Sequence, residues 1–142
     1  MRMAKQGILL LVLLSAPVIS WADNHRASDW PEGSAMHTGR TAQAELAVAD
    51  KELNRVYQAL LQSLPKDQSD QYTRRTVVEA QRAWVGYRDA TCNLVGELSG
   101  AVRMWKSTYS VVCLVGATKK RTEYLKNLTA CVESAERCDR LE

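Results

Sequence analysis

Four cysteines are the residues of this chain best suited to a defined chemistry. The sequence places them at Cys92, Cys113, Cys131 and Cys138. Four cysteines allow three disulfide pairings. No pair has the C-x-x-C spacing of a zinc site, and the only imidazole donors, His25 and His37, lie outside the periodic part of the chain. The cysteines are therefore interpreted as disulfide partners, and neither a metal nor another cofactor is expected.

A second group of residues could recognise a protein partner. The stretch 99–110 has mixed polarity and no clear period, and it is predicted to be a loop. Its cations and aromatic side chains are Arg103, Trp105, Lys106 and Tyr109. Cations can donate to a partner's carboxylates, and aromatic rings can anchor in an apolar wall. These four residues are the candidate partner-binding residues, and the alternative is a solvated loop with Trp105 folded back onto the core.

Catalysis by acidic side chains is a further possibility that the sequence raises. A carboxylate such as Glu79 or Asp89 could act as a general acid or base. No nucleophile, metal-ligand set or glycine-rich phosphate loop accompanies either residue in the sequence. The chain is therefore not expected to be an enzyme.

The length and charge of the chain limit the remaining functions. It has 142 residues, of which 19 are Lys or Arg and 16 are Asp or Glu. That length suits one domain. A nucleic-acid-binding domain needs a concentrated basic face, and no such concentration is visible here. Nucleic acid is therefore not expected as a partner.

The first 22 residues have the features of a secretory signal peptide. Arg2 and Lys5 precede an aliphatic run over residues 7–14, and Ser20 and Ala22 place small residues before a cleavage point. The apolar run is shorter than the roughly 20 residues of a transmembrane helix. An uncleaved membrane anchor is the alternative. Cleavage after Ala22 predicts a periplasmic or secreted protein with no stable membrane insertion.

Export favours disulfides, because oxidising compartments preserve them. No cysteine precedes Cys92, so the sequence has no candidate for the modified cysteine of a lipoprotein. Residues 23–40 contain Pro31 and Gly33 and have no apolar period, so they are predicted to be a flexible leader before a helical domain over 41–142.

Three amphipathic patterns follow the leader. Apolar residues recur every three or four positions in each pattern, which indicates one face of a helix. The first pattern is Leu46, Ala49, Leu53, Val56, Leu60 and Leu64; the second is Val77, Ala80, Trp84, Tyr87, Thr91, Leu94 and Leu98; the third is Val112, Gly116, Tyr124, Leu128 and Val132. Pro65 separates the first two patterns. Trp84 and Tyr87 are therefore predicted to lie in the core.

Three such helices can bury their apolar faces only against one another, which predicts an all-α, small antiparallel three-helix (possibly four-helix) bundle. Antiparallel neighbours bring Cys92 and Cys113 together, and Cys131 then pairs with Cys138 by elimination. In a continuous helix the last two cysteines would lie about 10.5 Å apart along the axis, so their pairing requires the helix to end between them. Arg88 is expected to pair with a carboxylate of another helix, such as Asp50.

The segments Gln81–Cys92 and Asp50–Tyr57 resemble the lysozyme inhibitor LprI-like family of small exported bacterial proteins. The first carries the pattern W-x-x-Y-R-D-x-x-C, and the second resembles D-x-x-L-N-x-x-Y. The motif residues, interpreted as structural, are Asp50, Leu53, Asn54, Tyr57, Gln81, Trp84, Tyr87, Arg88, Asp89 and Arg121. Two features depart from the family pattern: the cysteine ahead of Asp50 is missing, and the glycine-rich loop is reduced to Gly100.

The resemblance implies an exported helical protein that binds and inhibits lysozyme or a related cell-wall hydrolase. The alternative is a periplasmic helical interaction module that binds a different envelope or exported protein. Both expectations involve protein–protein contact and need no cofactor. The resemblance does not indicate which lysozyme would be bound or whether the chain associates with itself.

Overall fold

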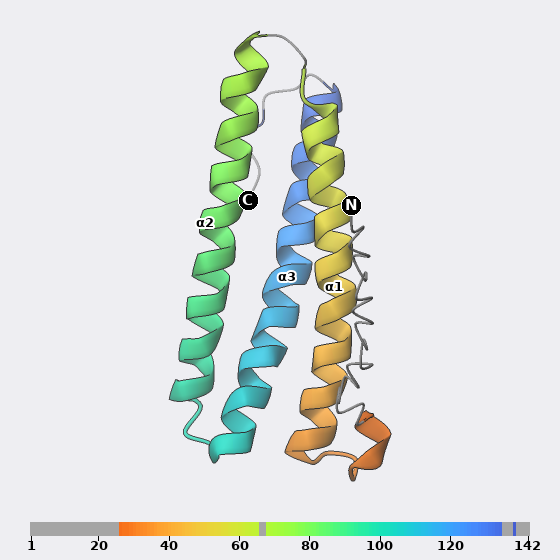
Figure 1. Cartoon of the computed structure of the whole chain (residues 1–142), viewed down its shortest axis with the longest axis vertical. Helices are drawn as coiled ribbons and strands as arrows, with labels where there is room; N and C mark the ends of the chain where they lie inside the picture. Colours follow the sequence, from red (N-terminus) through yellow and green to blue (C-terminus); the bar gives the residue numbers. More distant parts are fainter. Residues whose placement is uncertain (1–25, 66–67, 135–137, 139–142) are drawn as a thin grey trace, which may run out of the picture.

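Three long helices make up the fold of this chain (Figure 1). The computed structural model describes residues 26–65, 68–134 and 138. A short 3-10 helix, η1 (Ala27–Asp29), precedes α1 (Ala35–Ser63), α2 (Gln68–Leu98) and α3 (Arg103–Ser134). The described residues contain no strand, and the expected all-α three-helix bundle is confirmed. The expected signal peptide and His25 lie outside the described residues.

The helix α1 begins at Ala35, within the segment predicted to be a flexible leader. Ser34 explains this start, because its Oγ accepts a hydrogen bond from the backbone N–H of His37 at 3.1 Å. The hydroxyl of Thr108 on α3 donates to the carbonyl oxygen of Ala35 at 2.9 Å. The predicted start near Thr41 was therefore too late, because a polar cap and a tertiary hydrogen bond stabilise a first turn that has little apolar signal.

Pro65 ends the first helix as the sequence predicts. Leu64, the residue before it, has the extended backbone that a following proline favours, with φ −64° and ψ 143°. Arg74 near the start of α2 donates through Nη2 to the carbonyl oxygen of Leu61 at 2.8 Å. The chain therefore reverses here, and α2 runs antiparallel to α1 (Figure 1).

The connection between α2 and α3 is a short turn over residues 99–102. The loop predicted over 99–110 is wrong, because α3 already begins at Arg103. Gly100 has φ +66°, a left-handed conformation that glycine adopts at low cost. The turn reverses the chain a second time, so α3 runs antiparallel to α2 and parallel to α1 (Figure 1).

The hydrophobic core lies mainly between α1 and α3. Leu53, Val56 and Leu60 of α1 pack with Leu125 of α3, and each is at least 95% buried. Tyr57, Val77, Trp84, Tyr124, Leu128 and Val132 pack around this cluster as half-buried side chains. The helix α3 packs along both α1 and α2, whereas α1 and α2 have little contact with each other. Thus α3 is the central element of the fold.

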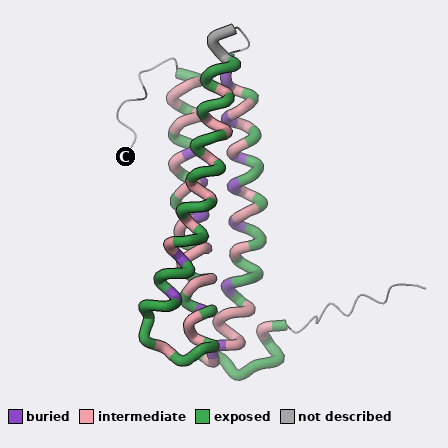
Figure 2. Tube along the Cα trace, turned by 60° about the vertical axis from the view of Figure 1, so that its left-hand side comes forward, coloured by how far each residue is buried: buried purple, intermediate pink, exposed green. Residues whose placement is uncertain are grey.

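The apolar face predicted for α2 is largely wrong. Tyr87 is 69% exposed, and Ala80, Leu94 and Leu98 are also exposed. Trp84 is half-buried against the core, as its predicted core position requires. Because α2 packs almost entirely against α3, it buries a narrow face that includes Cys92, and the rest of its apolar stripe remains at the surface (Figure 2).

The apolar face predicted for α3 is also partly wrong. Val112 and Gly116 are exposed, whereas Thr108, Thr118 and Thr122 are buried. A helix with neighbours on two sides buries residues around much of its circumference, so its sequence shows no single apolar period. The buried threonines satisfy their hydroxyls within the protein: for example, the Thr122 hydroxyl donates to the Thr118 carbonyl oxygen at 2.9 Å.

Two disulfides join the four cysteines. Cys92 of α2 pairs with Cys113 of α3 at a Cα–Cα distance of 5.4 Å. Cys131 pairs with Cys138 at 5.8 Å, and α3 ends at Ser134, between these two residues. Both pairings are those expected from an antiparallel α2–α3 pair. No helix among the described residues is long and apolar enough to cross a membrane.

Candidate functional site

The motif residues meet in a polar cluster where the three helices approach one another. Arg88 of α2 donates through Nη1 to Asp50 Oδ1 of α1 and to Thr118 Oγ1 of α3, both at 2.9 Å. Its Nε donates to Asp89 Oδ1, also at 2.9 Å. The Arg88 side chain is only 11% exposed, so these hydrogen bonds replace the water it lost on burial. Arg88 therefore links α1 and α2 where these helices have few other contacts.

Trp84 lies between two guanidinium groups in the same cluster. The Cζ atoms of Arg88 and Arg121 are 5.2 Å and 5.4 Å from the centre of its ring. Arg121 also lies 5.0 Å from the centre of the Tyr124 ring, and its Nε donates to Gln81 Oε1 at 3.0 Å. Burial lowers the pKa of Arg121, and the nearby Tyr124 opposes that shift. The aromatic faces compensate cations that are partly removed from water.

Most of the motif residues contact other residues within the bundle. Leu53 is in the core and Tyr57 is half-buried beside it, but Asn54 is exposed. Arg88 pairs with Asp50 of another helix as expected, and it also pairs with the adjacent Asp89. Arg121 bonds to Gln81 rather than to a carboxylate. The carboxylates of the cluster are held by arginine, which suits ion pairing more than proton transfer.

A different set of residues forms an exposed end of the bundle, which we call the α2–α3 tip. Its residues are Leu98, Val102, Arg103, Met104, Trp105, Lys106 and Tyr109. Leu98 is 76% exposed and Val102 is 73% exposed, and Met104 and Tyr109 are also exposed. Arg103 is exposed as the first residue of α3. Apolar side chains and a cation thus lie together at a turn of the chain.

The four predicted partner-binding residues lie in the first two turns of α3 and not on a loop. The rings of Trp105 and Tyr109 stack with their centres 5.6 Å apart, one helical turn from each other. Trp105 is half-buried, which partly matches the alternative in which it folds back onto the core. Lys106 Nζ lies 2.8 Å from Glu97 Oε2, so this cation already has a partner within the chain.

The α2–α3 tip is held firmly on the bundle. The Cys92–Cys113 disulfide joins the two helices beside it. The helices approach closely at Gly96, because a Cβ atom there would lie 2.6 Å from the carbonyl oxygen of Lys106. A disulfide and a close backbone contact therefore hold together the two helices from which the tip extends, which restricts the motion of the turn between them.

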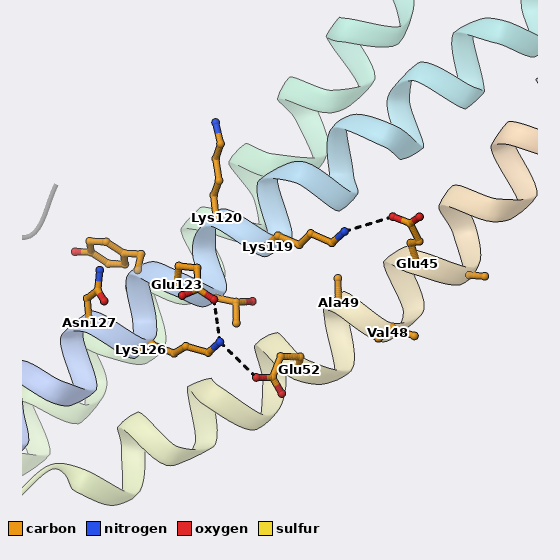
Figure 3. Close-up of a pocket in the computed structure, with 12 residues that line it drawn as sticks. Glu45, Val48, Ala49, Glu52, Lys119, Lys120, Glu123, Lys126 and Asn127 are labelled. Carbon is orange, nitrogen blue, oxygen red and sulfur yellow. Dashed lines mark hydrogen bonds and ion pairs between the residues drawn. The ribbon is translucent and has the colours of Figure 1, made fainter.

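A third feature is a shallow groove of about 1010 Å³ between α1 and α3. Val48 and Ala49 of α1 line it, and Figure 3 shows Lys119 and Lys126 of α3 reaching across it to carboxylates of α1. Lys119 Nζ lies 3.4 Å from Glu45 Oε2, and Lys126 Nζ lies 3.8 Å from Glu52 Oε1. These exposed pairs contribute little stability individually.

Sequence reasoning missed several residues that the structure brings to these places. His37 lies in the segment predicted to be a flexible leader, but it is half-buried in α1, and its Nδ1 lies 3.1 Å from the carbonyl oxygen of Ala27. Leu98, Val102 and Met104 were not among the candidate binding residues. Their signal was present in the sequence as apolar residues on both sides of a turn glycine, where polar residues are more common.

Comparison with known proteins gives a family and one distant relative. The family model described as lysozyme inhibitor LprI matches residues 30–125. The chain is also similar to an uncharacterized protein of Rhizobium meliloti (strain 1021), with 33% identity over 96% of this chain and 99% of that protein. No solved structure matches the chain.

Proposed function

The chain belongs to the lysozyme inhibitor LprI family, and from this membership we propose that it inhibits lysozyme or a related cell-wall hydrolase by direct protein–protein contact. The matched range begins just after η1 and ends within the second half of α3, so it includes the motif cluster and the α2–α3 tip. We also propose that the chain is exported, with cleavage after Ala22, and that both disulfides form in the exported protein.

The α2–α3 tip is the surface best suited to this function, and it is the observation that carries the proposal. A lysozyme active site is a cleft with two catalytic carboxyl groups. The exposed side chains of Leu98, Val102 and Met104 could enter such a cleft, and Arg103 could donate to a carboxylate there. Arg103 fits this role better than Lys106, because Lys106 is paired with Glu97.

The rigid support of the tip favours tight binding. A segment that is already ordered loses less conformational entropy on binding than a flexible loop. The Cys92–Cys113 disulfide and the helical start of α3 provide that order. The stacked rings of Trp105 and Tyr109 lie on the side of the same helix and would extend the contact beyond the cleft.

The direct test is a titration of the oxidised protein from Asp23 to Glu142 against lysozymes of the chicken, invertebrate and goose types. Wall lysis and binding should be followed together near physiological salt, because nonspecific ionic attachment weakens as salt rises. We expect saturable inhibition of at least one type at micromolar or lower concentration. Folded protein that inhibits none of the three would contradict the proposal and direct the search to another envelope protein.

Variants then test the tip. Arg103→Ala should weaken inhibition about tenfold or more, and adding Lys106→Ala should weaken it little further. Arg82→Ala is the matched control, because Arg82 is an exposed arginine on α2, outside the tip. Met104→Asp should abolish cleft insertion without affecting the fold, since Met104 is 51% exposed. Full inhibition by the Arg103→Ala, Lys106→Ala protein would exclude the tip as the binding surface.

A further inference from the structure

The outer face of α2 carries an apolar seam that no part of the described chain covers. The seam consists of Tyr72, Thr76, Ala80, Ala83, Tyr87, Ala90, Leu94 and Leu98, and all eight residues are exposed. Their spacings of three and four residues are those of a helix that packs lengthwise against another helix. Tyr87 and Leu94 alone expose 69% and 55% of their surfaces. This face therefore has the pattern of a helix–helix interface without a partner in the fold.

The seam has a symmetry that identifies the partner. Its residues are placed symmetrically about Val85, so that an antiparallel second copy of α2 would pair Ala83 with Tyr87 and Ala80 with Ala90. The same alignment pairs Thr76 with Leu94 and Tyr72 with Leu98. Near the centre of the seam, Tyr87 and Leu94 would each face a smaller side chain, whereas at its two ends Tyr72 would face Leu98. Matching large to small residues lets two helices approach and interdigitate.

Charges beside the seam favour the antiparallel arrangement over the parallel one. Arg75 near the start of α2 and Glu97 near its end are both exposed. In an antiparallel pair, Arg75 of one copy lies about 3 Å along the axis from the level of Glu97 of the other, a shift of two residues. In a parallel pair, Arg75 of one copy and Glu97 of the other would lie 22 residues apart, about 33 Å along the axis, and could not pair. Within the chain, Arg75 lies 4.0 Å from Glu79, and Glu97 lies 2.8 Å from Lys106.

We propose that the occupant of this seam is a second copy of the chain, forming a twofold-symmetric dimer through antiparallel α2 helices. A twofold interface uses the same surface on both copies, which the symmetric seam satisfies. The two α2–α3 tips then lie at opposite ends of the dimer. Leu98 belongs to both the seam and the tip, whereas the other residues of each tip lie outside the seam and remain accessible in the dimer.

The test is the molar mass of the disulfide-bonded protein from Asp23 to Glu142, measured by sedimentation equilibrium over a range of concentrations without lysozyme. We expect a monomer–dimer equilibrium in the unmodified protein. Tyr87→Asp should shift the protein to monomer, because it buries two charges at the centre of the seam. Val48→Asp is the matched control, because Val48 is 70% exposed on α1 and lies outside the seam, so the dimer should persist. Unchanged helical circular dichroism would show that both variants fold.

Charge reversal tests the orientation. Arg75→Glu and Glu97→Arg should each weaken the dimer, and the double variant should regain affinity only if the helices are antiparallel. An unmodified protein that stays monomeric at all concentrations, or a Tyr87→Asp variant that stays dimeric, would overturn the proposal. A monomeric protein whose lysozyme inhibition is lost in Tyr87→Asp would overturn it as well and would assign this face to the enzyme.

Discussion

The two long interfaces of this fold are built in different ways. Between α1 and α3, buried aliphatic side chains such as Leu60 and Leu125 lie in one continuous core. Between α2 and α3, a disulfide, the contact of the Arg121 guanidinium with the Trp84 ring and the hydrogen bond from Arg88 to Thr118 carry much of the contact. Hydrophobic burial is roughly proportional to area and tolerates small shifts, whereas disulfides and hydrogen bonds require defined geometry.

The two interfaces therefore have different roles in the fold. The α1–α3 core stabilises the fold, and the α2–α3 contacts fix where α2 and the α2–α3 tip lie. It also explains why α2 has an exposed apolar seam: its attachment needs only one narrow face. The predictions below test this division, beginning with the largest expected effect.

Replacing Leu60 should destabilise the protein most. Leu60 is 1% exposed, so Leu60→Ala leaves a cavity and should lower the free energy of unfolding by about 2–5 kcal/mol. Leu98→Ala makes the same chemical change at an exposed position, where a shift within about 0.5 kcal/mol is expected. Urea unfolding of dilute protein measures both. Equal effects at the two positions would show that the α1–α3 core does not dominate stability.

Removing the Cys92–Cys113 disulfide should cause the second-largest loss of stability. The two residues are 21 positions apart, and loss of a loop of that size should cost about 3 kcal/mol on the chain-entropy model. Hydrogen exchange in the Cys92→Ala, Cys113→Ala variant should accelerate in α2 far more than in α1. The Cys131→Ala, Cys138→Ala variant opens a separation of seven residues and should cost less. Uniform acceleration across the helices would contradict the proposed division.

Arg88→Ala should have an intermediate effect, about 2 kcal/mol, because its partners Asp50 and Thr118 lose charge-assisted hydrogen bonds. Arg55→Ala provides the comparison, since Arg55 pairs with Glu52 on the exposed surface of α1 and should contribute within about 0.5 kcal/mol. Thermal unfolding of both variants is the measurement. Unchanged stability of Arg88→Ala would show that the polar cluster does not hold α2 in place.

The smallest effect concerns Glu52. A hydrogen bond from Arg55 lowers the pKa of Glu52 below its usual value, and attraction to Arg55 and Lys126 adds to that shift despite partial desolvation. A lowered folded-state pKa stabilises the protein above the unfolded-state pKa, and the contribution is lost as the pH falls through the folded-state value. Glu52→Gln should therefore lower Tm slightly at pH 7 and make no difference at a pH below both values. If Glu52→Gln lowered Tm more in acid than at pH 7, the result would contradict a lowered pKa of Glu52 in the folded protein.

The sequence predicted the elements that depend on local signals. The Pro65 break and the period of Leu53, Val56 and Leu60 indicated α1 correctly, because proline and a one-sided apolar face act within a few residues. The antiparallel course of α2 and α3 followed from three apolar faces that can be buried only against one another, and it indicated the pairing of Cys92 with Cys113 that the structure has. The motif in α2 indicated the family that the comparison with known families shows.

Other features depended on which helices become neighbours. The sequence assigned Tyr87 to the core because it shares a stripe with Trp84, yet only Trp84 meets the core cluster. It assigned residues 103–110 to a loop because α3, packed on two sides, has no single apolar face. Both errors have the same cause. The spacing of apolar residues indicates one face of a helix, but it does not indicate which other helix packs against that face.

By itself, therefore, the sequence determined three helices, their order, the break at Pro65 and the family, because these follow from short-range periodicity, turn residues and a local motif. Only the tertiary structure decided that α3 lies at the centre, that Arg88 bridges Asp50 and Thr118, and that Tyr87 faces outward. Those outcomes depend on contacts between residues distant in the chain. Their energies depend on the packing of whole helices and cannot be read from the spacing within one of them.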